Sequence, residues 1–269
     1  MNPLLEATRE QRKQQRKKQK RYQVFCNVFA PILAIILIIA AWQLIVTKNN
    51  VPAWKFPSAS AVFSSMVLDF KSYLPHIWRT FSTILIGWVC ACVIGVLLAG
   101  IICNFPLVGV TLTPYLNLLC TLPIITMVPM MYVFMGVGRK VIIIAVILQS
   151  FAIVNLNSVT GFLNVPVIRR ELMTSLRATR LQTFFRCILP SALPYVFTGM
   201  RLSAIFATTT CISSELCGSM IGLGAKIITA KQFMQSNVIF ASIFFIAMIG
   251  IFFYLLISVL ESKIITWKD

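Results

Sequence analysis

The chain has 269 residues, of which 58% are apolar and only 12% are charged, about half the charge of an ordinary soluble domain. Long tracts contain no Asp, Glu, Lys or Arg at all: 22–47, 80–138, 141–168 and 232–260. One bilayer crossing needs roughly 20 apolar residues, so these tracts together hold at least five crossings. This composition excludes a soluble enzyme, a disordered protein and a secreted disulfide scaffold. It predicts an all-α polytopic membrane protein.

The chain begins with a strongly basic segment. Eight of its 24 Lys and Arg residues lie within 9–21. A polybasic segment beside a membrane helix attracts anionic headgroups and keeps that end in the cytoplasm. We therefore expect residues 1–24 to form a basic cytoplasmic tail and 25–269 to form one transmembrane domain. On this interpretation the net charge of +17 reports orientation in the membrane, and no nucleic acid partner is expected.

Six membrane-spanning helices are predicted after the tail, at about 26–47, 77–103, 108–135, 141–160, 191–215 and 238–260. Between the first two, apolar residues repeat at a spacing of three to four over 58–72, which indicates an amphipathic surface helix that begins after Pro57. Pro114, Pro123 and Pro129 should kink or interrupt the third span. Backbone groups freed by such a break are tolerated in a membrane only where they are buried in protein or line a cavity.

An even number of spans places both termini on the same side of the membrane. Because the basic tail is expected in the cytoplasm, both termini are expected there. With this orientation the cytoplasmic segments hold fifteen Lys and Arg residues and the outer segments hold eight. The bias agrees with the positive-inside rule. We expect a multi-pass protein of the cytoplasmic membrane.

The segment 164–187 between the fourth and fifth spans is too polar to cross a membrane. It contains five arginines around Glu171. Pro166 followed by apolar residues at helical spacing predicts a short amphipathic helix. Such a helix either offers a surface to a cytosolic partner or lies on the inner leaflet, anchored by its arginines. The periodicity does not distinguish the two.

Residues 171–190 resemble the EAA loop of binding-protein-dependent ABC importer permeases, whose pattern is E-A-A-x3-G-x9-I-x-L-P. Glu171, Leu189 and Pro190 match this pattern at its full spacing. Arg177 stands in place of the glycine, and glycine permits backbone angles that strain arginine. Segments at 56–59, 136–138, 199–202 and 214–215 resemble the nitrate, sulfonate and taurine branch of these permeases. The resemblance covers about 55–265.

The resemblance implies a bacterial type I ABC importer-like permease with six transmembrane helices, working as a homodimer in the inner membrane. It also implies a cytosolic ABC ATPase dimer and an extracytoplasmic solute-binding protein as partners. A coupling helix at about 164–187 would contact the ATPase through Glu171, Ser175, Arg177, Ala178, Arg180, Leu189 and Pro190. The chain has no G-x4-G-K-[ST] loop, so we expect no cofactor in it, with ATP and Mg on the partner ATPase and no enzymatic activity of its own.

The fifth predicted span is unusually polar for a membrane helix. Intramembrane charges are costly and tend to face a cavity or a partner. We expect this face to line the translocation path, through Arg201, Thr208, Thr209, Ser213, Ser214 and Glu215, with Thr121 and Gln149 as weaker candidates. In the alternative, the hydroxyls donate hydrogen bonds to carbonyls of their own helix, and Arg201 has a structural role as a partner of another side chain.

The resemblance suggests a small anion as substrate, such as a sulfonate, taurine or nitrate. A vitamin or vitamin precursor, such as the pyrimidine of thiamine or riboflavin, is the alternative. A secondary transporter or channel would need mid-membrane carboxylates, and here only Glu215 qualifies. An integral membrane enzyme would need a catalytic cluster, and with a single histidine, His76, no metal site is expected.

Overall fold

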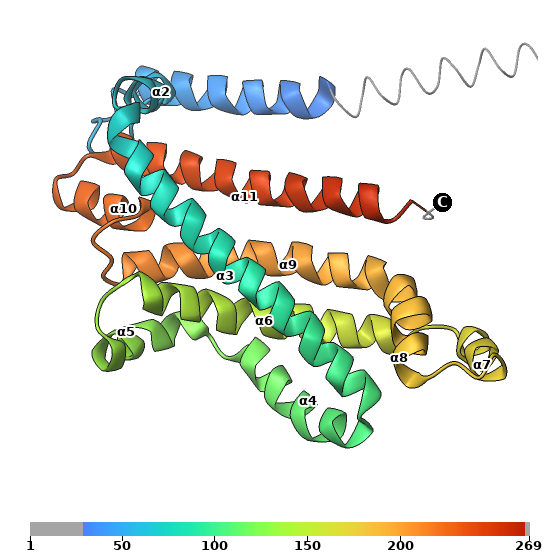
Figure 1. Ribbon diagram of the computed structural model, residues 1–269. Coiled ribbons are helices and arrows are strands. Elements are labelled where there is room, and N and C mark those ends of the chain that lie inside the picture. The colour runs from blue at the N-terminus through green and yellow to red at the C-terminus, as the bar shows by residue number, and fades with distance from the viewer. Residues whose placement is uncertain (1–28, 267–269) are drawn as a thin grey trace, which may run out of the picture.

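The computed structural model describes residues 29–266, which fold into a bundle of helices (Figure 1). The basic tail predicted at 1–24 lies outside the described residues. In chain order the elements are Phe29–Lys48, α2 (Ala59–Leu68), α3 (Phe70–Asn104), α4 (Pro106–Thr121), α5 (Ile124–Met135), α6 (Arg139–Leu163), α7 (Val167–Ser175), α8 (Arg180–Thr183), the π-helical segment η1 (Phe184–Ile188), α9 (Leu189–Leu216), α10 (Leu223–Gln232) and α11 (Ser236–Ile264).

Each predicted span corresponds to a helix or a helix pair. Four helices in the described chain are long and apolar enough to cross a membrane: Phe29–Lys48, α3, α6 and α11. The pair α4 and α5 makes a fifth crossing if it is counted as one span. The span predicted at 191–215 corresponds to α9, whose 28 residues extend about 42 Å. Arg201 and the Thr run make α9 more polar than the four helices named above.

The third predicted span is broken, as its prolines indicate. α4 and α5 meet at an angle of 93°. The break falls at Leu122, which has extended backbone angles, and Pro123, whose ψ of 85° is also not helical. The surface helix predicted at 58–72 is shorter than expected. Ser58 caps α2 by accepting a hydrogen bond from the Ala61 amide, and Asp69 ends this helix, so the chain continues from Phe70 as α3.

The ends of the bundle separate the predicted cytoplasmic and outer segments. In Figure 1, α7 and α8 lie at the same end as the start of Phe29–Lys48 and the last turn of α11. α5 and α10 lie at the opposite end. This arrangement places the first and last described residues on the side of α7, as the predicted topology requires.

The core of the bundle is α6, which packs along both α3 and α9. Glycines permit these close approaches. A side chain added at Gly95 of α3 would place its Cβ 2.8 Å from the Phe151 carbonyl oxygen and 2.9 Å from Val154 Cβ. On the other side of α6, a Cβ at Gly199 of α9 would lie 2.8 Å from Asn157 Cβ. Small residues of this kind let membrane helices pack backbone to backbone.

Replacing Gly95 with Leu is therefore expected to destabilise the bundle by about 1–3 kcal/mol, because α3 and α6 would be forced apart. The matched control is Gly250→Leu in α11, where no atom lies within 4 Å of the added Cβ. Thermal unfolding of both variants in detergent measures the difference. Equal midpoints for the two variants would show that the α3–α6 contact does not limit stability.

Candidate functional site

α7 is attached to both of the long helices that flank it in sequence. The Arg170 guanidinium donates to the Phe162 carbonyl in the last turn of α6. The Arg169 guanidinium donates to the Ser191 hydroxyl at the start of α9, over 2.9 Å. Cations are favoured at the carbonyl end of a helix, which explains the first contact. A displacement of α7 therefore acts on α6 and α9 together.

The outward face of α7 combines apolar side chains with one carboxylate. Ile168 and Leu172 are 71% and 60% exposed, although both are large and apolar. With Glu171 and Ser175 they border a surface depression of about 390 Å³. Exposed apolar residues gathered in one patch indicate a protein or membrane contact. The predicted coupling residues Glu171 and Ser175 thus lie on one exposed surface, which we call the α7 surface.

The turn after α7 keeps a geometry that usually requires glycine. Arg177 has a φ of 51°, in the left-handed region. Its amide donates to the Thr174 carbonyl over 2.9 Å, and the Ala178 amide donates to the Met173 carbonyl over 3.0 Å. These two bonds form a Schellman motif, in which the left-handed position is normally Gly. Arg177 therefore occupies the place of the EAA glycine without changing the turn, at a cost of about 1 kcal/mol.

Two substitutions at Arg177 separate backbone strain from charge. Arg177→Gly and Arg177→Val both remove the guanidinium, but only Val is strongly disfavoured in the left-handed region. We expect Gly to match or exceed the wild-type unfolding midpoint and Val to lose about 1 kcal/mol or more. Thermal unfolding in detergent measures this. If both variants lose stability equally, charge rather than conformation is what matters at this position.

The remaining predicted coupling residues connect this turn to α9. Thr179 caps α8 in a capping box with Gln182. Arg180 is exposed, and Ala178 is half-buried beside the turn. Leu189 and Pro190 continue the helix from η1 into α9: the Leu189 amide donates to the Phe184 carbonyl, and Pro190 lies in the first turn of α9. The predicted helix at 164–187 is thus two helices, α7 and α8, followed by η1.

The polar run of α9 divides between two sides of the helix. Thr209 is exposed and Ser213 is half-buried, whereas Ser214 is fully buried. The Thr208, Thr209 and Ser214 hydroxyls each donate to the carbonyl four residues earlier, over 2.9, 3.1 and 2.6 Å. Such bonds satisfy a hydroxyl inside a membrane helix. Only part of the run is therefore exposed in this conformation.

Arg201 makes its contacts inside the bundle. Its guanidinium forms an ion pair with Glu261 of α11. It also lies 5.3 Å from the centre of the Tyr254 ring, within the range of a cation–π contact. Both partners belong to α11, so Arg201 fastens α9 to the last helix.

Glu215 is the centre of a buried cluster at the end of the bundle where α5 and α10 lie. It is 1% exposed. Its carboxylate accepts hydrogen bonds from the Thr80 hydroxyl, at 2.8 and 3.0 Å, and from the Gly224 amide, at 2.9 Å. Thr80 in turn accepts from the Leu223 amide over 2.9 Å. We call these four residues the Glu215 clasp, because they hold the start of α10 against α3 and α9.

The glycine loop before α10 is shaped by this cluster. Gly222 has a φ of 144°, and a side chain there would collide with the Glu215 carboxylate. The Gly222 carbonyl and amide both lie beside His76 Nδ1, at 2.8 and 3.2 Å. His76 is therefore part of the support for this loop.

The two weaker path candidates differ in exposure. Thr121 is exposed at the end of α4, and its hydroxyl donates to the Leu118 carbonyl over 2.9 Å. Gln149 is buried within α6. Sequence reasoning did not single out Thr80, or Trp88, whose indole donates to the Ser203 hydroxyl over 3.0 Å. One sequence signal could have identified both residues. They are polar side chains within a tract without charged residues, and such side chains need hydrogen-bond partners in a membrane.

The fold is that of an ABC importer permease. It resembles the methionine ABC transporter MetNI in an inward facing conformation with a TM-score of 0.61 and 17% identity, over 71% of this chain and 95% of that one. Residues 91–266 match the family of binding-protein-dependent transport system inner membrane components, and the chain belongs to this family. It is accordingly a transport component of the membrane rather than an enzyme.

Two curated relatives share most of its length. A protein named as an aliphatic sulfonates transport permease, SsuC, of Bacillus subtilis is 29% identical over 237 residues, which is 87% of this chain and 85% of the relative. The taurine transport system permease protein TauC of Escherichia coli is 28% identical over 192 residues, which is 71% of this chain and 70% of the relative.

Proposed function

We propose that two copies of this chain form the translocation path of an ATP-driven importer for a small anion, such as a sulfonate, taurine or nitrate. The observation that carries the proposal is the α7 surface. It is exposed, apolar around Glu171, and bonded through Arg169 and Arg170 to α9 and α6. A surface of this kind suits a protein partner that exerts force on the spans.

In this proposal the partner is a cytosolic ABC ATPase dimer, which holds the ATP and Mg. Both termini of the permease are cytoplasmic in this proposal, and the first and last described residues lie on the side of α7. An extracytoplasmic solute-binding protein delivers the substrate at the opposite end, where α5 and α10 lie. Closure of the ATPase dimer displaces α7, and α6 and α9 then rock as packed bodies between outward and inward openings.

The exposed side of α9 lines the path in this proposal. Thr209 and Ser213 contribute hydroxyls there, and Thr121 of α4 contributes a third. The Thr209 and Thr121 hydroxyls donate to the Ile205 and Leu118 carbonyls in this conformation, so each must rotate away from its helix to donate to an anion oxygen. Such donors add no fixed charge to the path. Arg201, Ser214 and Glu215 hold the helices that frame the path, because their contacts are with other parts of the same bundle.

Three measurements test the proposal, two of them the class of transporter and the third the substrate. The permease is expressed with candidate ATPase and solute-binding subunits, and co-purification of the ATPase is measured in detergent. ATP-dependent uptake is then measured in vesicles loaded with ATP, with the binding protein and substrate added outside. A chain that purifies without an ATPase and transports on an ion gradient would instead be a secondary transporter. Binding of taurine, alkanesulfonates and nitrate, compared with riboflavin and thiamine pyrimidines, to the solute-binding protein assigns the substrate.

A further inference from the structure

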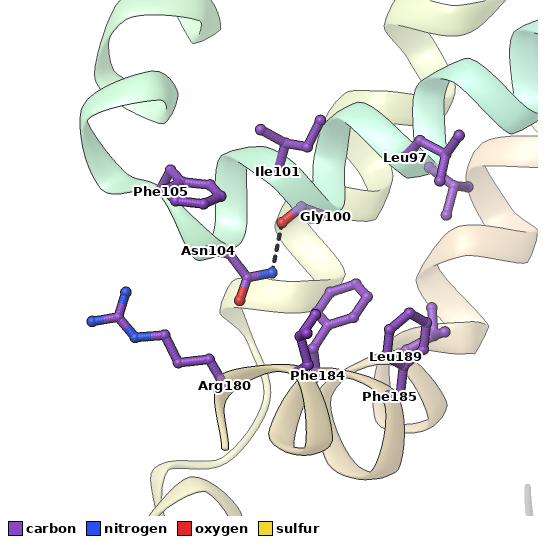
Figure 2. Close-up of a pocket in the computed structure, with 11 residues that line it drawn as sticks. Leu97, Gly100, Ile101, Asn104, Phe105, Arg180, Phe184, Phe185 and Leu189 are labelled. Atoms are coloured by element: carbon purple, nitrogen blue, oxygen red, sulfur yellow. Dashed lines mark hydrogen bonds between the residues drawn. The ribbon is translucent and has the colours of Figure 1, made fainter.

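A deep groove lies at the end of the bundle where α3 finishes and α9 begins. It has a volume of about 550 Å³ and lies between the last turns of α3 and the segment α8–η1–α9. Figure 2 shows Leu97 and Ile101 on one side, facing Phe184, Phe185 and Leu189 on the other. Its volume falls within the range of pockets that hold one small ligand.

The groove is apolar along its length and cationic at one end. Apart from Gly100, its polar lining is limited to Asn104 and Arg180. Figure 2 shows Arg180 beside Asn104 and Phe105, away from Leu97 and Leu189. The Asn104 amide donates to the Gly100 carbonyl over 2.8 Å. The Arg180 guanidinium has no hydrogen-bond or ion-pair partner within residues 29–266, so its charge is available to a ligand.

The groove is also placed at the depth of a lipid. Asn104 is the last residue of α3, so Arg180 lies where the apolar span ends. From there the lining extends back to Val96, about 12 Å along the helix at 1.5 Å per residue. An apolar channel that enters the membrane from a cationic mouth matches an acyl chain with an anionic headgroup.

We propose that this groove binds an anionic phospholipid of the inner leaflet, with an acyl chain between α3 and η1 and its phosphate on Arg180. The proposal takes the side of the membrane from the proposed function, but it does not require transport. The positive charge of Arg180 favours an anionic lipid over the chain's own basic tail as the occupant of the groove. The inner leaflet is anionic and attracts arginine near the surface, whereas the chain's own basic tail would be repelled by Arg180.

The bound lipid has a consequence for coupling. Phe184 packs against Phe162 of α6 with ring centres 5.2 Å apart, so one wall of the groove is continuous with the core. Arg180 is the first residue of α8, the helix that follows the α7 surface in sequence. A lipid in the groove therefore contacts the segment that must move when the ATPase acts.

The test uses the purified full-length chain in detergent, titrated with phosphatidylglycerol or phosphatidylcholine, with bound lipids counted by native mass spectrometry. Wild type is expected to retain phosphatidylglycerol more tightly, by about fivefold, the effect of one arginine near the surface. Arg180→Gln should remove this preference. Ile101→Trp, which fills the groove, should lower retention of both lipids. Leu107→Trp, which adds the same ring on the exposed face of α4, should retain wild-type binding.

Three outcomes would overturn the proposal. One is equal retention of the two lipids by wild type. Another is unchanged lipid retention in Ile101→Trp. The third is loss of the dimer in Ile101→Trp with an unchanged lipid count, which would assign the groove to a second copy of the chain. Since no transport or ATPase assay enters the test, its failure leaves the proposed function intact.

Discussion

Glu171→Ala is expected to lower ATPase co-purification and uptake by about tenfold or more, equivalent to at least 1.4 kcal/mol of docking free energy. Glu171 is exposed on the α7 surface and has no partner within residues 29–266, so it is free to pair with a partner protein. Its removal leaves apolar neighbours in place and should not alter insertion or folding. A pull-down of the ATPase and vesicle uptake measure the effect.

The control for Glu171 is Lys231→Ala, an exposed charge of α10 at the other end of the bundle. It should leave the ATPase pull-down unchanged. Arg180→Glu, at the start of α8, provides a second test of the same segment and should also uncouple transport. Docking that survives both Glu171→Ala and Arg180→Glu would mean that α7 is a membrane-surface helix and not the ATPase contact.

Glu215→Leu is expected to reduce the free energy of unfolding by about 3 kcal/mol, the largest stability effect among the predicted site residues. The substitution keeps most of the side-chain volume but leaves the Thr80 hydroxyl and the Gly224 amide without an acceptor in a buried place. Unsatisfied groups of this kind cost about 1–3 kcal/mol each. The unfolding midpoint in detergent measures the loss.

Glu215→Gln is the matched control, because its amide oxygen still accepts from Gly224 and its volume is nearly the same. It should retain more than half of the stability that Leu loses. A Glu215→Leu variant as stable as wild type would show that the Glu215 clasp is not needed to hold α10. The residue would then be free for a role in the translocation path.

The helices were predictable because charge is excluded from the membrane. The tracts without Asp, Glu, Lys or Arg each contain the expected helices, and Pro123 lies at the break between α4 and α5. Pro166 immediately precedes α7. Local rules sufficed at these places, since proline and charge act on the backbone and its solvent directly.

The site was less predictable because its contacts join distant segments. Thr209 and Thr210 are neighbours, yet one is exposed and the other buried. The side of α9 that becomes buried depends on the helices packed against it, chiefly α6. Arg201 pairs with Glu261, 60 residues later. At Arg177 the expectation from local propensity was overridden, because the Schellman bonds retain the left-handed turn despite the arginine side chain.

α9 is fastened at both of its ends, and this has a consequence for how the two faces of the membrane communicate. Its first turn is tied to α7 through Ser191, and its last turn is tied to α10 through Glu215, about 36 Å further along. One stiff rod thus joins the inner and outer loops. Linkage between two binding events is reciprocal. In the proposed importer, docking of the solute-binding protein should therefore raise the affinity for the ATPase by the same factor by which the ATPase raises the affinity for the solute-binding protein.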